Sequence, residues 1–475
     1  MGARKLDSNP DLKSKILSDN LISDSGTFPV LLTKVEINGG ETFSSIFFRK
    51  LLSPLIDDGD YTLAQLISNI SQSQKKLLQT GVFSDLAVSV QPDFYSGLPE
   101  VIDYNKEKSL PTKVIFDLST IDLNLSEGWF NFNNEEYMNI RLNYLNNNFN
   151  GNAETVRFDV DYNPYKPYDH LISNAKFLAN LNNPAYKFLV DLTHLHQNNQ
   201  SWQGVKESGT GGIMGLVNSS GDKPWSSFTG VSLLKRTTGV GEIDAEYERV
   251  PEINVSEGEH LKTALVSNVS YNKLTYLNQL TRSFPCCGYN WSLSNEIASY
   301  QGNTPGTFIK SAFSYNFCKS FFNSFLTTQI SADVGGIFSH TETPIHHSDK
   351  FYLGGYDSFP GFAKNAIDTN GGTQFYRLQG TVYSKVPYWL HPIRSSSSET
   401  TPLRLYATGL VGNVTDSNIF DDERGAASAG LGLRYFNNWA RFDLGYYFSS
   451  RVGSDSLGGI KSGLKFGLSI GGSNS

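Results

Sequence analysis

The amino-acid sequence predicts an all-β transmembrane barrel of sixteen antiparallel strands, preceded by one small α+β domain. Segments of about ten residues alternate in polarity, as tilted membrane strands do. The chain is also poor in charge (18%) and rich in glycine (43) and in aromatic residues (13%). Mean hydropathy is −0.31 and no run of 18 apolar residues occurs, which excludes a membrane-spanning helix. It does not exclude a barrel, whose apolar residues alternate with polar ones.

Charge and cysteine content narrow the class of protein. The chain carries 39 Lys+Arg against 46 Asp+Glu, a net charge of −7, which argues against a dedicated nucleic-acid binder. Its 3 cysteines cannot form a disulfide framework. The first residues start no apolar secretory signal, and their aspartates are atypical of a transit peptide. We therefore expect a barrel of an organellar outer membrane.

The amino-terminal part divides into an arm and a domain. Residues 1–27 are polar and aperiodic, which predicts a flexible arm. Residues 28–121 follow the order strand, helix, helix, strand, strand, which predicts the small α+β domain.

Two helices are expected in this domain. The first has apolar residues at helical spacing from Phe43 until Pro54, which we expect to end it. The second begins with a capping box formed by Thr62 and Gln65, and Gly81 stands where a C-terminal cap belongs.

Residues 128–475 are expected to form the barrel, with a long loop at 339–371. The strands of a soluble β-sandwich would also alternate in polarity. Here, however, Arg and Asp stand in mid-strand on the polar face, and the apolar face ends in aromatic residues. That arrangement is typical of a wet lumen and a lipid face with aromatic girdles. The candidate strands lie at 133–144, 154–163, 170–180, 185–196, 201–216, 226–237, 240–250, 260–275, 288–299, 307–320, 322–338, 372–387, 403–414, 425–437, 440–450 and 460–472.

Three motifs and this domain order carry a resemblance that extends over about 28–472. The motifs are Thr80–Val88 in the α+β domain, Phe351–Phe362 in the long loop, and Lys461–Leu468, which fits the pattern of a barrel sorting signal. The chain resembles the bacterial surface antigen superfamily, whose barrels insert or translocate other proteins. With a single POTRA-like domain and no secretory signal, it is similar to the mitochondrial branch, the barrel subunits of sorting and assembly machineries.

The resemblance implies a loop inside the lumen and one departure from the family pattern. The family usually has an arginine before the Gly-Phe of the loop motif, where this chain has Pro360. In the family that arginine anchors the loop tip to acidic residues of the barrel wall, so this anchor must be altered or supplied elsewhere here. The expected loop residues are Gly354, Gly355, Phe359, Gly361 and Phe362.

Physical reasoning suggests how such a barrel could insert others. An unpaired backbone group in hydrocarbon costs several kcal/mol, so an entering precursor needs a template edge. The weak point should be the seam between the first and last strands, because the last strand is rich in glycine and glycine lowers strand stability. The same glycines could instead serve curvature or tight packing where the barrel closes. The hypothesis is that the first strand opens and pairs with the precursor's C-terminal signal. The expected first-strand residues are Tyr137, Met138, Asn139, Ile140, Arg141, Leu142 and Asn143, and those of the last strand are Lys461, Gly463, Phe466, Gly467 and Leu468.

Other polar clusters have more than one interpretation. A set of charged residues could form a mutually satisfied lumen network or could seat the loop and guide polar chains. This set comprises Arg377, Arg404, Arg434, Arg441 and Asp443.

A second cluster could be a zinc site, but it has no CxxC partner, and we interpret it as a solvated loop. This cluster comprises His340, Glu342, His346, His347 and Asp349. No nucleophile motif, phosphate-binding loop or dinucleotide fingerprint occurs in a supporting context, so we expect neither enzymatic activity nor a metal or other cofactor.

The predicted function is insertion and folding of β-barrel precursors in the mitochondrial outer membrane. The alternatives are a passive outer-membrane porin or a protein-translocating channel, and more distantly a soluble all-β enzyme or lectin. Expected partners are precursors with a C-terminal signal, peripheral accessory subunits and outer-membrane lipid, and not nucleic acid. The resemblance implies that the α+β domain faces the intermembrane space.

Overall fold

The structure is a computed structural model that describes residues 25–93, 109–134, 137–167, 169–199, 205–219, 224–240, 257–277, 284–302, 305–339, 345–387, 402–419, 424–453 and 459–474. Nearly all of the expected arm, and the candidate strand at 240–250 apart from Val240, lie outside these residues. The chain divides into two compact units. The first is built from residues up to Leu123 with Asn147–Thr155 and Ala179–Tyr186, and the second from the remainder beginning at Asn124.

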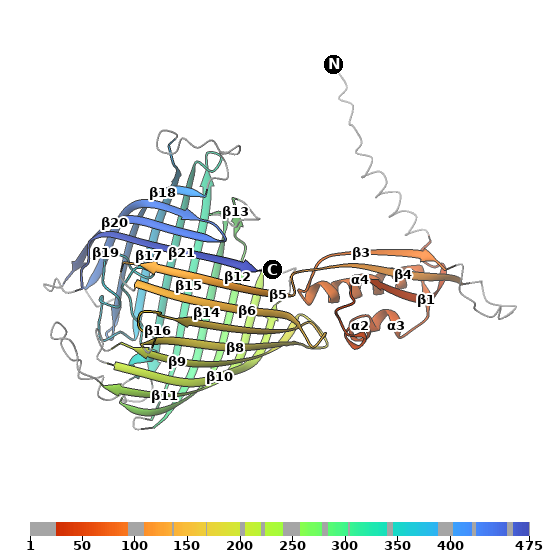
Figure 1. The fold of residues 1–475 in the computed structure, drawn as a ribbon, viewed down its shortest axis with the longest axis horizontal. Helices are drawn as coiled ribbons and strands as arrows, with labels where there is room; N and C mark the ends of the chain where they lie inside the picture. Colours follow the sequence, from red (N-terminus) through yellow and green to blue (C-terminus); the bar gives the residue numbers. More distant parts are fainter. Residues whose placement is uncertain are drawn as a thin grey trace, which may run out of the picture. The chain divides into compact units, whose positions relative to one another are not determined.

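The first unit contains a four-stranded sheet in the order β2-β1-β4-β3, with β1 and β4 parallel. Helices lie along one face of this sheet (Figure 1). Their apolar sides bury a core that includes Phe47, Leu66, Leu77 and Phe116. The elements are β1 (Pro29–Asn38), α2 (Ser45–Leu51), α3 (Ser53–Ile56), β2 (Asp60–Thr62), α4 (Leu63–Gln79), β3 (Phe83–Pro92) and β4 (Leu110–Thr120).

The better-marked helix forms as predicted. The Thr62 hydroxyl accepts from the Gln65 N–H at 3.3 Å, and the Gln65 side chain accepts from the Thr62 N–H at 3.0 Å. Gly81 follows α4 with a φ of 80°, which a C-terminal cap glycine adopts readily. Pro54 was expected to end the first helix, but it lies in the first turn of α3 instead. Proline is tolerated there because the N–H that it lacks would have no partner within the helix.

The second unit is a closed antiparallel barrel. Figure 1 shows its strands curving into a cylinder. Its first half comprises β5 (Asn124–Asn133), β6 (Tyr137–Phe149), β7 (Glu154–Tyr162), β8 (His170–Asn180), β9 (Tyr186–Asn198), β10 (Val205–Ser219), β11 (Trp225–Val240) and β12 (Gly258–Asn272). Its second half comprises β14 (Pro285–Gly302), β15 (Gly306–Phe321), β16 (Leu326–Ser339), β17 (Gln374–Lys385), β18 (Leu403–Thr415), β19 (Gly425–Phe436), β20 (Ala440–Val452) and β21 (Gly463–Asn474).

The described residues therefore contain sixteen long strands, the number predicted, together with the short β13 (Thr275–Tyr276) beside β14. The set differs in one member, because β5 was not among the predicted strands and the candidate strand at 240–250 lies outside the described residues apart from Val240. The barrel starts earlier than predicted, at Asn124 instead of residue 128. Residues 124–133 were missed because Glu127 and Gly128 look like a domain boundary. In the barrel, Glu127 is tolerated because its carboxylate accepts from the Asn143 side chain at 3.4 Å.

The two faces of the strands differ as the alternation predicted. Large apolar side chains are exposed on the outer face, including Met214, Val231, Leu431 and Phe448. On β20, Arg441 and Asp443 point instead to a hollow on the inner side of the wall. No helix within the described residues is long and apolar enough to cross a membrane.

Candidate functional site

The barrel closes where β21 pairs with β5. The register runs from Gly467 opposite Asn133 to Asn474 opposite Ser126. Asn134 extends this pairing, because its side-chain amide donates to the Leu464 carbonyl at 2.9 Å. Among the described long strands, β21 and β5 are the neighbours that are not consecutive in the chain, so we call their pairing the seam.

The predicted first-strand residues lie one strand away from the seam. Residues 137–143 belong to β6, which pairs with β5 on one side and lies beside β7 on the other. The expectation that Tyr137, Met138, Asn139, Ile140, Arg141, Leu142 and Asn143 form the first strand is therefore wrong. The strand that faces β21 is Ser126–Asn133, and the error follows directly from missing β5.

The predicted last-strand residues are located as expected, except that Lys461 precedes β21. The Lys461 N–H donates to the Gly361 carbonyl at 2.9 Å, so this residue pairs with the long loop. Gly463, Phe466, Gly467 and Leu468 lie in β21. Phe466 contacts Phe132 across the seam, with ring centroids 5.6 Å apart.

The glycines of β21 are not equivalent. A Cβ on Gly467 would come within 3.0 Å of the Tyr356 ring, and a Cβ on Gly471 within 3.0 Å of the Trp129 ring. A Cβ on Gly472 would meet nothing within 4 Å. Two of the glycines thus accommodate aromatic rings, which offsets part of the instability that glycine brings to a strand.

The long loop between β16 and β17 packs against the inner wall. Gly354 (φ +133°) and Gly361 (φ +100°) adopt backbone conformations that side chains disfavour. A Cβ on Gly361 would also collide with Ser449 and Ser428 of the wall. Phe359 and Phe362 are fully buried (0% exposed) and make an edge contact at 5.5 Å. The structure thus brings together the loop residues that the motif predicted, with Gly355 at the bridge to Phe359.

The loop tip is held through backbone carbonyls. The Ser428 hydroxyl donates to the Pro360 carbonyl at 2.6 Å, and the Arg377 guanidinium donates to the Ser358 carbonyl at 2.8 Å. The Arg451 guanidinium donates to the Ala366 carbonyl. Pro360 therefore leaves the tip attached, since its carbonyl accepts a bond that requires no arginine at that position.

A buried ionic cluster holds the start of the loop, at the short helix η2 (His347–Asp349). The Asp349 carboxylate pairs with Arg236 at 2.7 Å and with Lys262 at 2.5 Å. Lys310 donates to the Asp349 carbonyl at 2.7 Å. Two wall carboxylates complete the set, Glu207 with Arg236 at 3.3 Å and Glu296 with Lys262 at 2.6 Å. Three carboxylates thus balance three cations, and we call these six residues the Asp349 cluster.

Sequence reasoning treated His346, His347 and Asp349 as part of a solvated loop, which is wrong. The three residues are only 5%, 6% and 3% exposed. They lie against β10–β12, whose inward charges made burial of an acidic loop residue possible. The other two members of that group, His340 and Glu342, lie outside the described residues. No group of His, Cys, Asp or Glu within the described part of the chain is arranged to hold a metal ion.

Burial controls the protonation of the loop. It lowers the pKa of His347 to about 4, assisted by the nearby charge of Arg236, and it lowers the pKa of His346 further. Burial alone would raise the pKa of Asp349, but the charges of Arg236 and Lys262 outweigh it, so that pKa is lowered. Near neutral pH residues 346–349 of the loop therefore contribute two neutral histidines and one carboxylate.

Acid is expected to loosen the loop. A released histidine titrates near 6.5, whereas the seated His347 titrates near 4. From pH 6.5 down to about 4 the released loop therefore binds protons that the seated loop does not, which favours release. Hydrogen exchange of residues 345–372, corrected for the intrinsic effect of pH, should accelerate between pH 7.5 and 5. His347→Gln should weaken this dependence; an unchanged profile in that variant would contradict the assignment to His347.

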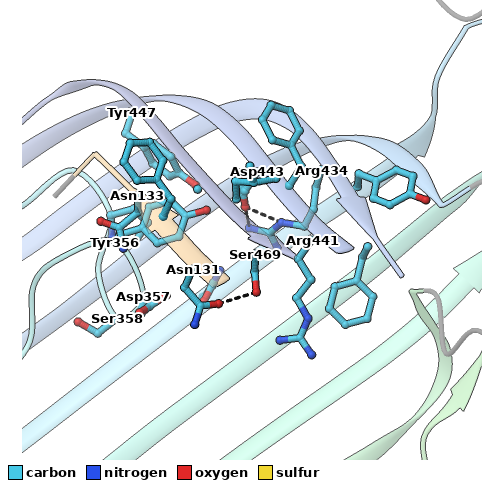
Figure 2. Close-up of a pocket in the computed structure, with 18 of the residues that line it drawn as sticks. Asn131, Asn133, Tyr356, Asp357, Ser358, Arg434, Arg441, Asp443, Tyr447 and Ser469 are labelled. Atoms are coloured by element: carbon cyan, nitrogen blue, oxygen red, sulfur yellow. Dashed lines mark hydrogen bonds and ion pairs between the residues drawn. The ribbon is translucent and has the colours of Figure 1, made fainter. Parts of the chain in front are cut away.

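A polar cavity of about 630 Å³ lies on the inner side of the seam (Figure 2). Asn131 and Asn133 of β5, Tyr356 and Asp357 of the loop, and Ser469 of β21 contribute to its walls. In Figure 2 the Ser469 hydroxyl bonds to Asn131 across the seam, a distance of 2.5 Å. Seam, loop and cavity therefore form one site, which we treat as the candidate functional site.

The charged set that could either form a lumen network or seat the loop forms ion pairs only in part. Arg377 pairs with Asp333 at 2.6 Å, and Arg434 pairs with Asp443. Arg404 is fully buried and donates to the Ser324 carbonyl at 2.7 Å. Within the described residues Arg441 makes no ion pair; its guanidinium lies over the Trp129 ring, 5.7 Å from the centroid.

Comparisons with known proteins agree with this architecture. The Omp85 superfamily domain matches residues 121–471. The "Sorting assembly machinery 50 kDa subunit" of Saccharomyces cerevisiae is 24% identical over 231 residues, which are 45% of this chain and 44% of that relative. The chain thus matches less than half of the relative's length.

Solved structures share the fold. The crystal structure of BamA from Haemophilus ducreyi lacking POTRA domains 1-3 superposes with a TM-score of 0.72 at 12% identity, covering 100% of this chain and 95% of that one. CdiB from Acinetobacter baumannii gives a TM-score of 0.55 at 15% identity, with coverage of 98% and 82%. Since the matched domain extends over most of the sequence and contains the loop and every barrel strand except the last three residues of β21, the chain belongs to the Omp85 superfamily.

Proposed function

We propose that this protein inserts and folds β-barrel precursors in the mitochondrial outer membrane by templating their strands at the seam. The observation that carries the proposal is the pairing of β21 with β5, two strands that no hairpin joins. They can separate without breaking a turn, and each then offers an edge of unpaired N–H and C=O groups. An entering strand can satisfy those groups by β-augmentation.

The loop supports the proposal because it is attached to the segment that enters β21. The Ala363 N–H donates to the Gly459 carbonyl at 2.8 Å, next to the bond from Lys461 to Gly361. Tyr356 packs on Gly467 within the strand itself. A loop bonded at these points stabilises one position of β21 relative to the inner wall. It also fills lumen space, which argues against a wide passive porin.

The resemblance to the yeast sorting subunit supports the proposed location and partners. We infer that the substrates are precursors with a C-terminal sorting signal, that peripheral accessory subunits assist, and that the α+β domain faces the intermembrane space. Strand exchange makes and breaks no covalent bond. The proposed activity therefore needs neither enzymatic catalysis nor a cofactor.

Site-specific crosslinking tests the proposal. Phe130→Cys lies on the outer face of β5, and Ile140→Cys is directly opposite it on β6, which makes it a matched control. A barrel precursor with a cysteine in its last strand should form a disulfide adduct with Phe130→Cys in intact mitochondria. Adducts should be absent with Ile140→Cys, because β6 has no free edge. Equal adducts at both positions, or adducts only at lumen positions, would refute templating at the seam.

A further inference from the structure

The seam is shaped to fit a strand without side chains at particular positions. Gly471 lies directly opposite Trp129 in the register of β21 and β5. The indole ring occupies the space that a side chain at 471 would need, since a Cβ there would come within 3.0 Å of three ring atoms. The indole is rigid and cannot move aside as the end of a flexible side chain can. The strand beside β5 must therefore have glycine opposite Trp129.

The same inner face carries two more constraints at alternate residues. The Ser469 hydroxyl donates to the Asn131 side chain at 2.5 Å. At Gly467 the Tyr356 ring of the loop takes the place of a side chain. Along β21 the inner face therefore presents a glycine, a hydroxyl side chain and a second glycine, at residues 467, 469 and 471. The intervening Leu468 and Ile470 belong to the opposite, apolar face.

The Trp129 ring is itself held in place. Arg441 reaches over the small residues of β21, and its guanidinium lies 5.7 Å from the Trp129 centroid and 4.8 Å from that of Phe436. Within the described residues this guanidinium has no ion pair that would draw it elsewhere. A cation over the face of tryptophan is attracted by the ring quadrupole. The ring is therefore a fixed part of the β5 surface.

We propose that Trp129 is a specificity-determining residue that selects entering strands with glycine at the position of Gly471. The inference rests on the proposed function, because β5 must be the strand that receives the precursor. The ligand class is a β-strand with apolar residues on one face and the pattern glycine, hydroxyl, glycine on the other. The required glycine stands three residues after the last apolar residue of the sorting-signal pattern, Leu468.

The neighbouring glycine provides a matched control. Gly472 lies opposite Gly128, and a Cβ there would meet nothing within 4 Å. Valine in place of either glycine changes the intrinsic strand propensity equally. Only a side chain at the position of Gly471 would meet the indole.

The experiment measures capture of a peptide by the full-length protein in liposomes. The probe is a peptide with the sequence of residues 461–474 carrying Ile470→Cys, and the protein carries Phe130→Cys, its partner in the register. We expect Gly471→Val in the peptide to lower the disulfide yield about tenfold or more, since overpacking a fixed site is strongly unfavourable. Gly472→Val should leave the yield unchanged. Trp129→Ala in the protein should bring the ratio of the two yields close to one.

The outcomes separate the inference from the function on which it rests. If the unmodified peptide forms no adduct with Phe130→Cys, β5 does not receive strands, and the proposed function itself fails. If it forms the adduct but Gly471→Val and Gly472→Val reduce the yield equally, β5 receives strands while Trp129 does not select them. A loss with Gly471→Val that persists in the Trp129→Ala protein also overturns the role of Trp129. The protein's own β21 competes equally with every peptide, so the ratios are unaffected.

Discussion

Joining β5 to β21 by a disulfide between Phe130→Cys and Ile470→Cys should reduce the assembly of imported barrel precursors by about tenfold or more. The two residues are opposite each other in the register, on the outer face, where directly opposed Cβ atoms lie about 5 Å apart. A covalent bond there prevents separation of β5 from β21, whose edges are the ones among the described strands that the proposal assigns to a precursor. Assembly of radiolabelled precursors in isolated mitochondria, followed on native gels, measures the effect.

A second disulfide controls for the chemistry. Leu431→Cys on β19 and Tyr446→Cys on β20 form an outward pair of the same kind, between strands that a hairpin already joins. This bond should leave precursor assembly unchanged, and reduction of the seam disulfide should restore it. If the locked seam assembles precursors as fast as the reduced protein does, templating between these strands is untenable.

The fold was largely predictable because each barrel strand carries its own signal. Alternation in segments such as residues 440–450 depends only on which face meets lipid, and it survives without knowledge of neighbouring strands. β5 was not predicted because Glu127 and Gly128 interrupt the alternation of apolar residues there. The Glu127 carboxylate accepts a hydrogen bond from Asn143 of β6, a partner that a single strand does not reveal. One missed strand moved the predicted seam from β5 to β6.

The loop shows the same division between local and distant information. Gly354 and Gly361 were predictable, because a positive φ is a property of the residue and its motif. The Asp349 cluster was not, because Asp349 is 113 residues from Arg236 and 87 from Lys262. Inward-facing Arg236 and Lys262 on β11 and β12 could have indicated that an acidic partner was needed. No feature of the sequence indicated that the loop would supply this acidic partner.

Replacing Asp349 by asparagine should release the start of the loop and impair precursor assembly. The Asp349 cluster would change from three carboxylates and three cations to two carboxylates and three cations. Removing one member of a buried ion pair costs about 3–5 kcal/mol, because the remaining charge stays desolvated without compensation. Lys350 and Lys364 lie in this loop, so limited trypsin digestion at neutral pH should cleave the Asp349→Asn protein there before the barrel unfolds.

Asp416→Asn is the matched control for this prediction. Asp416 also pairs with a loop residue, Lys350 at 2.9 Å, but its side chain is 45% exposed. The Lys350 side chain is only 6% exposed, but solvent screens the Asp416 carboxylate, so its loss should cost less than the loss of Asp349 and should leave the loop more resistant to trypsin than Asp349→Asn does. Adding Lys262→Met to Asp349→Asn restores equal numbers of opposite charges in the cluster, and it should recover part of the resistance. If Asp349→Asn and Asp416→Asn behave alike, the loop does not depend on the buried charge, and the carbonyl bonds at its tip must hold it alone.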